Sequence, residues 1–391
     1  MFHLVSKCDN NLRDSNIASY TVLKMLQDSG VKLILSTYAA DPILEGNIVK
    51  GIFIENKSGR QAVKAKIVID ATGEADVAKR ACAPILYPKA SYHQIDSHAP
   101  TGMGLSFILG GVAWEKYQAY KKEHKSSEED IKWANQVLSE KRINQFRRDH
   151  ILTFIRKAWE NREYTIPEIN LGKVKIPINV EIENIKETEL ALGHIAPERV
   201  FEEINVGDGM HISMFEVKLR MYAFEAVQFY KKFVPGFENA YLLLIAPFLG
   251  ARGGPCIEGE YTLTMSDCRA GRRFSDVIYL YGEFRALRYT CEKGECKWAN
   301  VPYRIMLPKK IDGLLAVGRS ASGIPDTLLR NRLAVKHMGQ AGGTAAALCA
   351  KRDISPKELD VKELQQVLLD AGFYLGDRYR LRELGLKDCS D

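Results

Sequence analysis

The residues with the clearest chemical potential come directly after a run of apolar, β-branched residues. Ile67–Ile69 lead into Asp70–Gly73, and the residues after this turn are typical of a helix. Gly73 has no Cβ, so its backbone can approach a ligand closely. Ligands of doubly wound sheets bind beyond the carboxyl ends of the strands. The segment therefore indicates a nucleotide site; the alternative is a tight strand-to-helix turn in which Asp70 is only a local cap.

A second strand that ends on glycine lies near the other end of the chain. Residues 313–318 predict a short buried strand, and residues 333–350 predict a helix rich in Gly and Ala. Each Gly inside a helix costs ~1 kcal/mol relative to Ala, so Gly339, Gly342 and Gly343 imply close packing against that helix. A strand, a partner helix or a flat ring would each satisfy this requirement, and helix–sheet packing alone is the simplest alternative. The start of such a helix also carries partial positive charge, which suits a negative group.

The elements around these turns predict an α/β fold. A helix begins near Asp14 or Ser15 and ends at Gly30, a strand follows at 31–35, and antiparallel strands with tight turns run from 43 to 69. A strand that is apolar on both faces, as at 62–69, belongs in the middle of a parallel sheet covered on both sides.

The middle of the chain has a different character. It predicts a strand at 103–109, helices within 113–163, short β-rich pieces over 164–215 and an amphipathic helix over 216–233. This section reads as a layer inserted into the first domain. A capping box at 355–358 then begins a helical tail.

Composition limits the class of protein. The 391 residues carry a net charge of +6, spread thinly over mixed-sign helix faces, so neither a nucleic-acid partner nor a membrane is expected. No apolar run approaches the ~20 residues of a membrane span, and the start lacks a signal-peptide core. The eight cysteines include no CxxC pair, which fits a reducing, cytoplasmic location. Cys291 and Cys296 are either half of a metal site or two thiols beside a turn, the simpler interpretation.

Five stretches carry a resemblance to a known family. They are "SGRQAVKAKIVIDATGEADVAKRACAP", "VPGFENAYLLLIAPFLGAR", "IEGEYTLTMSDCRAGRRFSD", "VPYRIMLPKKIDGLLAVGRSASG" and "GQAGGTAAALCAKRDISPKELDVKELQ". With these, the chain resembles FAD-dependent oxidoreductases related to the flavoprotein subunit of heterodisulfide reductase. The resemblance implies a glutathione-reductase-type fold that binds FAD and transfers hydride or electrons to or from a small-molecule substrate. The residues that it implies for cofactor binding are Ala71, Thr72, Gly73, Gly318, Arg319, Gly339, Gln340 and Gly342.

The expected fold class is therefore α/β, an incomplete FAD/NAD(P)-binding Rossmann-like domain with an inserted α+β substrate or cap domain. Its expected parts are 1–84 and 306–352 for the FAD-binding domain, 85–305 for the inserted region and 353–391 for the tail.

The departures from the family pattern lead to further expectations. The strand–GxGxxG–helix unit with which the family begins is not found, so we expect the N-terminal unit to be missing from this chain. The alternatives to an intact enzyme are a non-catalytic remnant without flavin, or a subunit that binds FAD only with a separately encoded N-terminal piece. Relatives are richer in arginine where this chain reads "LGARGGPC", and only Arg252 is retained.

The catalytic residues and a metal centre have weaker support. Arg252, His337 and His211 are candidates for the acid or base, although a lone His is more often structural. A 4Fe-4S cluster is implied only by distant family association. Such clusters need closely spaced cysteines, which this sequence lacks, so no metal ligands are expected.

Overall fold

The computed structural model describes residues 15–87, 103–140, 149–163, 168–171, 174–185, 189–197, 206–251, 254–281, 298–323 and 332–387. The chain forms two compact units. Unit 1 consists of Met1–Thr37, Gly104–Glu198 and Ser213–Gly250. Unit 2 consists of Tyr38–Met103, Arg199–Ile212 and Ala251–Asp391.

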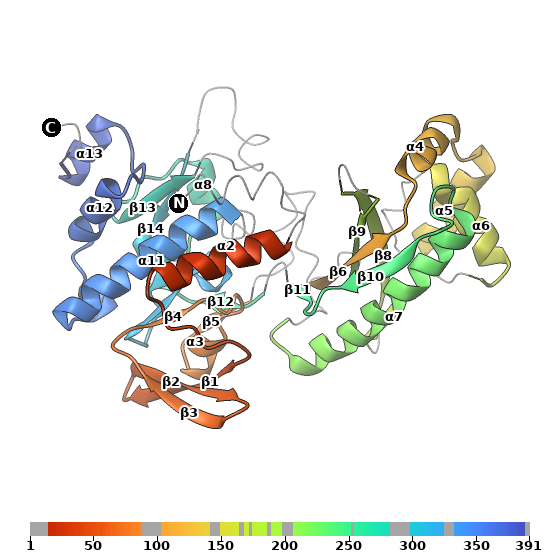
Figure 1. Ribbon diagram of the computed structural model, residues 1–391. Coiled ribbons are helices and arrows are strands. Elements are labelled where there is room, and N and C mark those ends of the chain that lie inside the picture. The colour runs from red at the N-terminus through yellow and green to blue at the C-terminus, as the bar shows by residue number, and fades with distance from the viewer. Residues whose placement is uncertain are drawn as a thin grey trace. The chain divides into compact units, whose positions relative to one another are not determined.

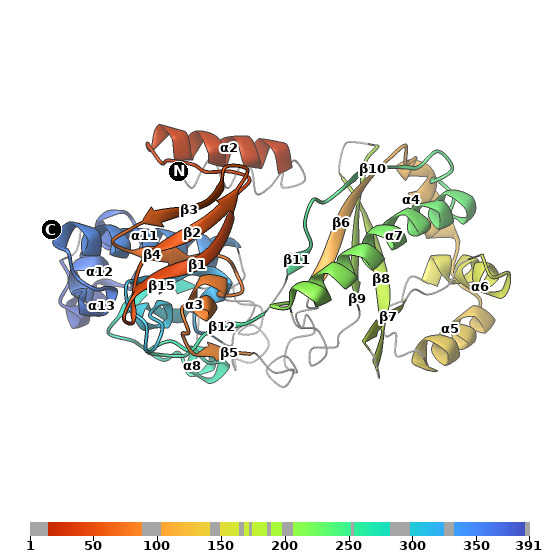
Figure 2. The same cartoon turned by 90° about the horizontal axis from the view of Figure 1, so that it is seen from below.

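Unit 1 is built on an antiparallel sheet with the strand order β10-β6-β9-β8-β7 (Figure 1). The strands are β6 (Met103–Gly110), β7 (Glu168–Leu171), β8 (Val174–Asn184), β9 (Ala191–Pro197) and β10 (Tyr241–Ile245). The helices are α2 (Ser15–Asp28), α4 (Trp114–Glu123), α5 (Glu128–Glu140), η2 (Asp149–Ile151), α6 (Leu152–Glu160) and α7 (Gly209–Phe233). Figure 2 shows the long α7 running along this sheet.

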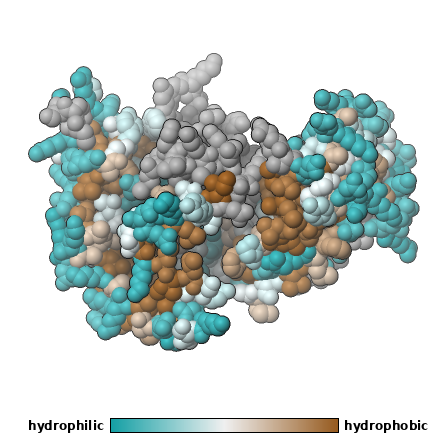
Figure 3. Space-filling view, in the orientation of Figure 1, coloured by the Kyte–Doolittle hydropathy of each residue, from teal (hydrophilic) through white to brown (hydrophobic). Residues whose placement is uncertain are grey.

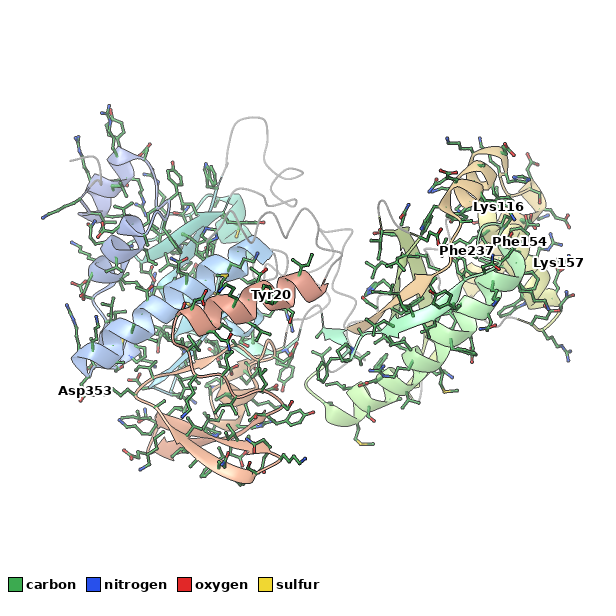
Figure 4. The ribbon with its side chains drawn as sticks, viewed as in Figure 1. Tyr20, Lys116, Phe154, Lys157, Phe237 and Asp353 are labelled. Carbon is green, nitrogen blue, oxygen red and sulfur yellow. The ribbon has the colours of Figure 1, made fainter. Side chains whose placement is uncertain are left out.

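An aromatic cluster joins α4 to the segment after α7. Phe237 makes edge contacts with Trp114 and Tyr117, with ring centroids 6.0 and 5.2 Å apart, and Lys116 on the same helix bonds Glu238 (Figure 4). Edge-to-face ring contacts add stability beyond the area that they bury, so this cluster holds α4 against the segment that follows α7. The surface over α4, α5 and α6 is mostly hydrophilic (Figure 3), as expected for solvated helix faces.

Unit 2 contains a meander and a pair of parallel strands. Its strands are β1 (Tyr38–Glu45), β2 (Ile48–Asn56), β3 (Gly59–Lys64), β4 (Val68–Asp70), β5 (Ile85–Leu86), β12 (Cys256–Ile257), β13 (Val277–Tyr281), β14 (Ala299–Pro302) and β15 (Leu314–Ala316). The short β11 (Gly250–Ala251) pairs with β6 in the sheet of unit 1. Its helices are α3 (Asp76–Arg80), α8 (Met265–Arg269), η3 (Tyr303–Met306), η4 (Gly318–Ser320), α11 (Arg332–Arg352), η5 (Pro356–Glu358), α12 (Val361–Asp370) and α13 (Arg378–Leu384). β1, β2 and β3 form the antiparallel meander that the turn residues predict.

β4 and β15 pair in parallel, although they are about 250 residues apart in the sequence. Leu314, Leu315 and Ala316 lie opposite Val68, Ile69 and Asp70. Val68 N–H donates to the Gly313 carbonyl, and the Asp70 backbone carbonyl accepts from Val317 N–H, both at 3.0 Å. Alternate residues of a parallel strand bond to the same neighbour, so the backbone of Ile69 points to the opposite edge of β4. No strand in the described part of the chain pairs with that edge.

Several local predictions are wrong. Residues 31–35 form no strand, and Val31, Ile34 and Leu35 are exposed. The strand expected at 62–69 is interrupted at 65–67, which leaves an exposed β3 and a short β4. Ile69 is 37% exposed, so this strand is not covered on both faces. Among the described residues, no helix is both long and apolar enough to cross a membrane.

Candidate functional site

The turn after β4 is held by the carboxylate of Asp70. This side chain is fully buried and accepts hydrogen bonds from Thr72 N–H at 3.0 Å, Thr72 Oγ1 at 2.7 Å and Ala78 N–H at 2.9 Å. Thr72 Oγ1 in turn accepts from Asp76 N–H at 2.9 Å. The carboxylate therefore satisfies amides at the start of α3, where negative charge is favourable. A buried strand ends on Asp here because the next helix needs that acceptor, so Asp70 acts as a local cap whether or not a ligand binds beside the turn.

A serine from the other strand completes the turn. Ser320 Oγ accepts from the amides of Gly73 and Ala75, both at 3.0 Å, and Ser320 is fully buried. Ala75 has φ of 56°, which costs a residue with a Cβ roughly 1–2 kcal/mol. Two hydrogen bonds from one hydroxyl hold the backbone on either side of Glu74 and so fix this strained conformation. Gly73 has φ of 93°, which favours glycine.

Arg319 lies against this turn. A Cβ on Gly73 would be 2.5 Å from Arg319 Nη2, so the guanidinium lies in the space next to Gly73 and would have to shift if this residue had a side chain. Arg319 Nη2 also donates to Glu74 Oε1. Burial raises the pKa of the Glu74 carboxyl, and the facing guanidinium opposes that shift without cancelling it. Arg319 Nε is buried and has no hydrogen-bond partner among the described residues.

The helix α11 has one packed glycine and two open ones. A Cβ on Gly342 would be 2.8 Å from Val317 Cγ1, so this glycine serves the packing of the helix on the end of β15. Gly339 and Gly343 have nothing within 4 Å of their Cβ positions. These two glycines are four residues apart and therefore share one face of the helix. Packing explains Gly342, whereas Gly339 and Gly343 leave a strip of bare helix backbone among the described residues.

The other candidate residues are scattered. Ala71 is exposed, and the Gln340 carbonyl accepts from Thr344 Oγ1 within the helix. Gly318 has φ of 64° and open space around its Cβ position, with only Val335 at 3.9 Å. His337 contacts the rings of Tyr279 and Phe373, with centroids 5.5 and 5.2 Å away.

The remaining candidates lie elsewhere. His211 donates its backbone amide to Asp208 Oδ1 at the start of α7. Arg252, Cys291 and Cys296 lie outside the described residues. Within the residues that the structure describes, no group of three or more His, Cys, Asp or Glu could hold a metal ion. The structure therefore gives no support to a 4Fe-4S cluster.

The residues that lie together fit part of a dinucleotide. Gly73 and Gly318 follow the carboxyl ends of neighbouring parallel strands, where such ligands bind. Arg319 provides the cation, and its unpartnered Nε is an unused donor for an anionic group. The amides of Thr72 and Gly73 are already used within the turn, so they are not phosphate ligands in this conformation.

Two site residues were not predicted from the sequence. Glu74 and Ser320 are adjacent to recognised motif residues, but neither was assigned a role. Ser320 could have been found from the two predicted strands that end on glycine. If these strands pair, the turns that follow them lie next to one another. Glu74 follows Gly73 and has no local pattern that indicates its partner.

These features define an α/β protein whose candidate site lies at the ends of two parallel strands. A family model described as FAD dependent oxidoreductase matches residues 3–368. The chain belongs to this family of FAD-dependent oxidoreductases. No curated protein matches the sequence.

Two solved structures resemble the chain at low scores. A triple mutant of the flavin-dependent brominase Bmp2 is 12% identical, with a TM-score of 0.31 over 89% of this chain and 58% of that one. The myxobacterial chondrochloren halogenase CndH, a variant of FAD-dependent halogenases, is 10% identical, with a TM-score of 0.32 over 93% of this chain and 53% of that one. The chain thus spans little more than half the length of either structure.

Proposed function

We propose that this chain binds FAD beyond the ends of β4 and β15 and takes part in flavin-mediated hydride or electron transfer with a small molecule. The observation that carries the proposal is the meeting of Gly73 and Arg319, from turns that follow two paired parallel strands. When bound, FAD supplies the redox chemistry, and the protein supplies binding and orientation.

The chain's own residues would divide the binding as follows. Arg319 holds an anionic part of the cofactor through its guanidinium, with Nε as the unused donor. Gly318 lets the cofactor approach the backbone, because the space around its Cβ position is open. Gly339 and Gly343 leave a bare face of α11 that a flat ring system can approach. Arg252 and His337 are retained as candidate acid–base groups.

Visible absorbance tests this proposal directly. The purified full chain, or the chain mixed with FAD and desalted, is expected to be yellow with the blue absorption bands of oxidised flavin. Arg319→Ala is expected to weaken FAD binding by at least tenfold, because it removes a charge-assisted contact. Lys66→Ala, which removes an exposed cation paired with Asp353, is the control and leaves binding unchanged. A wild-type chain that stays colourless with FAD contradicts binding by this chain alone.

A second candidate follows from the edge of β4 that pairs with no strand among the described residues. Ile69 directs its backbone groups away from β15 and is 37% exposed, and parallel sheets normally have further strands or a covering layer. A separately encoded strand–GxGxxG–helix piece that adds to this edge would complete the cofactor site. Co-expression with such a piece tests this candidate: flavin retained only in the pair supports it, and flavin retained by the chain alone overturns it. A chain that binds flavin in neither setting is the non-catalytic remnant.

We also propose that the chain is related to the flavoprotein subunit of heterodisulfide reductase, on the five sequence stretches that carry the resemblance. Residues of the inserted region would then position the substrate. The chain would not need an iron–sulfur cluster. Iron and acid-labile sulfide analysis of the purified protein tests this point: both are expected at background level, and stoichiometric iron and sulfide would contradict it.

A further inference from the structure

The sheet of unit 1 has one fully covered face and one face that is less covered. Along β6, Leu105, Phe107 and Leu109 are 0–1% exposed, whereas Ser106 and Ile108 between them are half-buried. Successive side chains of a strand point to opposite faces. Ser106 and Ile108 therefore lie on the less covered face.

A serine and a histidine meet on that face. Ser106 and His194 are directly opposite in the β6–β9 register, and Ser106 Oγ lies 3.3 Å from His194 Nδ1. The imidazole leans over Gly104, where a Cβ would be 2.7 Å from the ring carbon Cε1. Gly104 thus makes the room that the ring occupies. A hydroxyl within reach of an imidazole is the arrangement that proton transfer requires.

Apolar residues continue the same face beside the pair. Ile108 is opposite Leu192 of β9 and also opposite Leu244 of β10, and the side chain of Leu244 is 51% exposed. On the other side of β9, Glu181 and Glu183 of β8 hold the register positions opposite His194 and Leu192. The face therefore offers one hydroxyl and one imidazole, with aliphatic residues on one side and the register positions of two glutamates on the other.

We propose that Ser106 and His194 form a proton relay that binds a small molecule with an apolar body and one weakly acidic hydroxyl, such as a phenol or an enol. The ligand's O–H bond breaks and its proton passes to Ser106 Oγ, while the serine's own hydrogen passes to His194 Nδ1. The products are a ligand oxyanion and an imidazolium, so charge and atoms balance. The imidazolium then donates to Ser106 Oγ, and the serine donates to the oxyanion.

This inference goes beyond the proposed function, because it concerns residues of unit 1 alone. The relay itself needs no flavin. Binding of a hydroxyl compound is therefore measured on the chain without FAD, and its result is independent of whether the chain is yellow.

The probe is p-nitrophenol, whose phenolate absorbs visible light and whose neutral form does not. At a pH below the probe's own pKa in solution, adding the full chain is expected to produce the phenolate band with saturation. His194→Gln and Ser106→Ala are each expected to lower the bound phenolate signal at least tenfold. Ser106→Thr keeps a hydroxyl on a strand and is expected to retain the signal.

Two further variants keep the test decisive. Gly104→Ala removes neither reacting group but displaces the imidazole, so it is expected to weaken the signal as well. His124→Gln changes an exposed histidine stacked on Tyr120 and is expected to leave the signal unchanged. Cooperative urea unfolding shows which variants are folded. The proposal is overturned if the wild-type chain gives no phenolate band, or if any folded His194→Gln or Ser106→Ala variant keeps the wild-type signal.

Discussion

The guanidinium of Arg319 lies against Gly73, in the space that a side chain at residue 73 would enter. A Cβ on Gly73 would be 2.5 Å from Nη2 and 3.1 Å from Cζ of Arg319. The turn after β4 and the turn after β15 are therefore matched to one another as a pair. The following predictions test what that match does for stability and for binding.

Gly73→Ala is expected to destabilise the protein by about 2–4 kcal/mol. The substitution adds a left-handed backbone penalty at φ of 93° and a collision with the guanidinium. Gly59→Ala is the control, because Gly59 has φ of 87° with nothing within 4 Å of its Cβ position. Urea unfolding should show a smaller decrease in the free energy of unfolding for Gly59→Ala, about 1–2 kcal/mol. Equal losses would show that Arg319 gives way without cost.

Asp70→Asn is expected to lower the free energy of unfolding by about 1–3 kcal/mol. The Asn side chain has a nitrogen in place of one carboxylate oxygen, and this buried nitrogen cannot accept the hydrogen bond from Ala78 N–H. The matched control is Asp360→Asn at the start of α12, where an exposed carboxylate accepts from Lys362 N–H at 3.0 Å. Asn caps a helix about as well as Asp, so this change should be within about 0.5 kcal/mol. Urea unfolding of both variants measures the difference. A loss for Asp70→Asn no larger than that of the control would contradict the capping role.

Gly343→Ala and Gly342→Ala are expected to have opposite effects on the stability of the chain. Alanine at 343 meets nothing within 4 Å and should stabilise the chain without FAD by ~1 kcal/mol through helix propensity. Alanine at 342 would come within 2.8 Å of Val317 and should destabilise it. If the bare face of α11 receives the flavin ring, Gly343→Ala also weakens FAD binding. Thermal unfolding and FAD titration separate the two effects, and a Gly343→Ala variant with unchanged FAD affinity would place the ring elsewhere.

Glu74→Gln is expected to strengthen FAD binding several-fold, because Glu74 competes with an anionic ligand for Arg319. The pKa of Glu74 is raised by burial, so its ionised form is the costly one in the folded state. The stability linked to this carboxyl is complete below its unfolded pKa and is lost as the pH rises through the raised folded value. Unfolding free energies of wild type and Glu74→Gln should therefore diverge as the pH increases above about 4. FAD titration at two pH values checks the competition: the wild type should bind more tightly at the lower pH, and the variant should not share this trend.

The sequence predicted those features whose causes are local. The tight turns gave the β1–β2–β3 meander, and the capping box at Ser355 is present with both of its hydrogen bonds. The helix rich in Gly and Ala was placed correctly as α11. In each case the side chains that determine the structure are within a few residues of it.

Features that depend on distant partners were missed. Four of the five residues at 31–35 are apolar, but a strand forms only where a neighbour supplies hydrogen bonds, and none of the described residues does so. The Ser106–His194 and Glu74–Arg319 pairs join residues 88 and 245 positions apart, respectively. No local pattern indicates such pairs. The two strands that end on glycine were recognised separately, and their pairing is what connects the site.

The hydroxyl of Ser320 has a consequence for biosynthesis. It supplies the acceptor for two amides of the turn after β4, and it lies 247 residues further along the chain than Gly73. At a translation rate of about 5–20 residues per second, roughly 12–50 s pass between synthesis of the turn and synthesis of its partner. During that interval the turn in the nascent chain lacks the Ser320 hydroxyl that accepts from its amides, and β4 lacks β15 as its pairing partner. The N-terminal part of unit 2 therefore completes this turn only after residue 320, in the last fifth of the chain, has been synthesised.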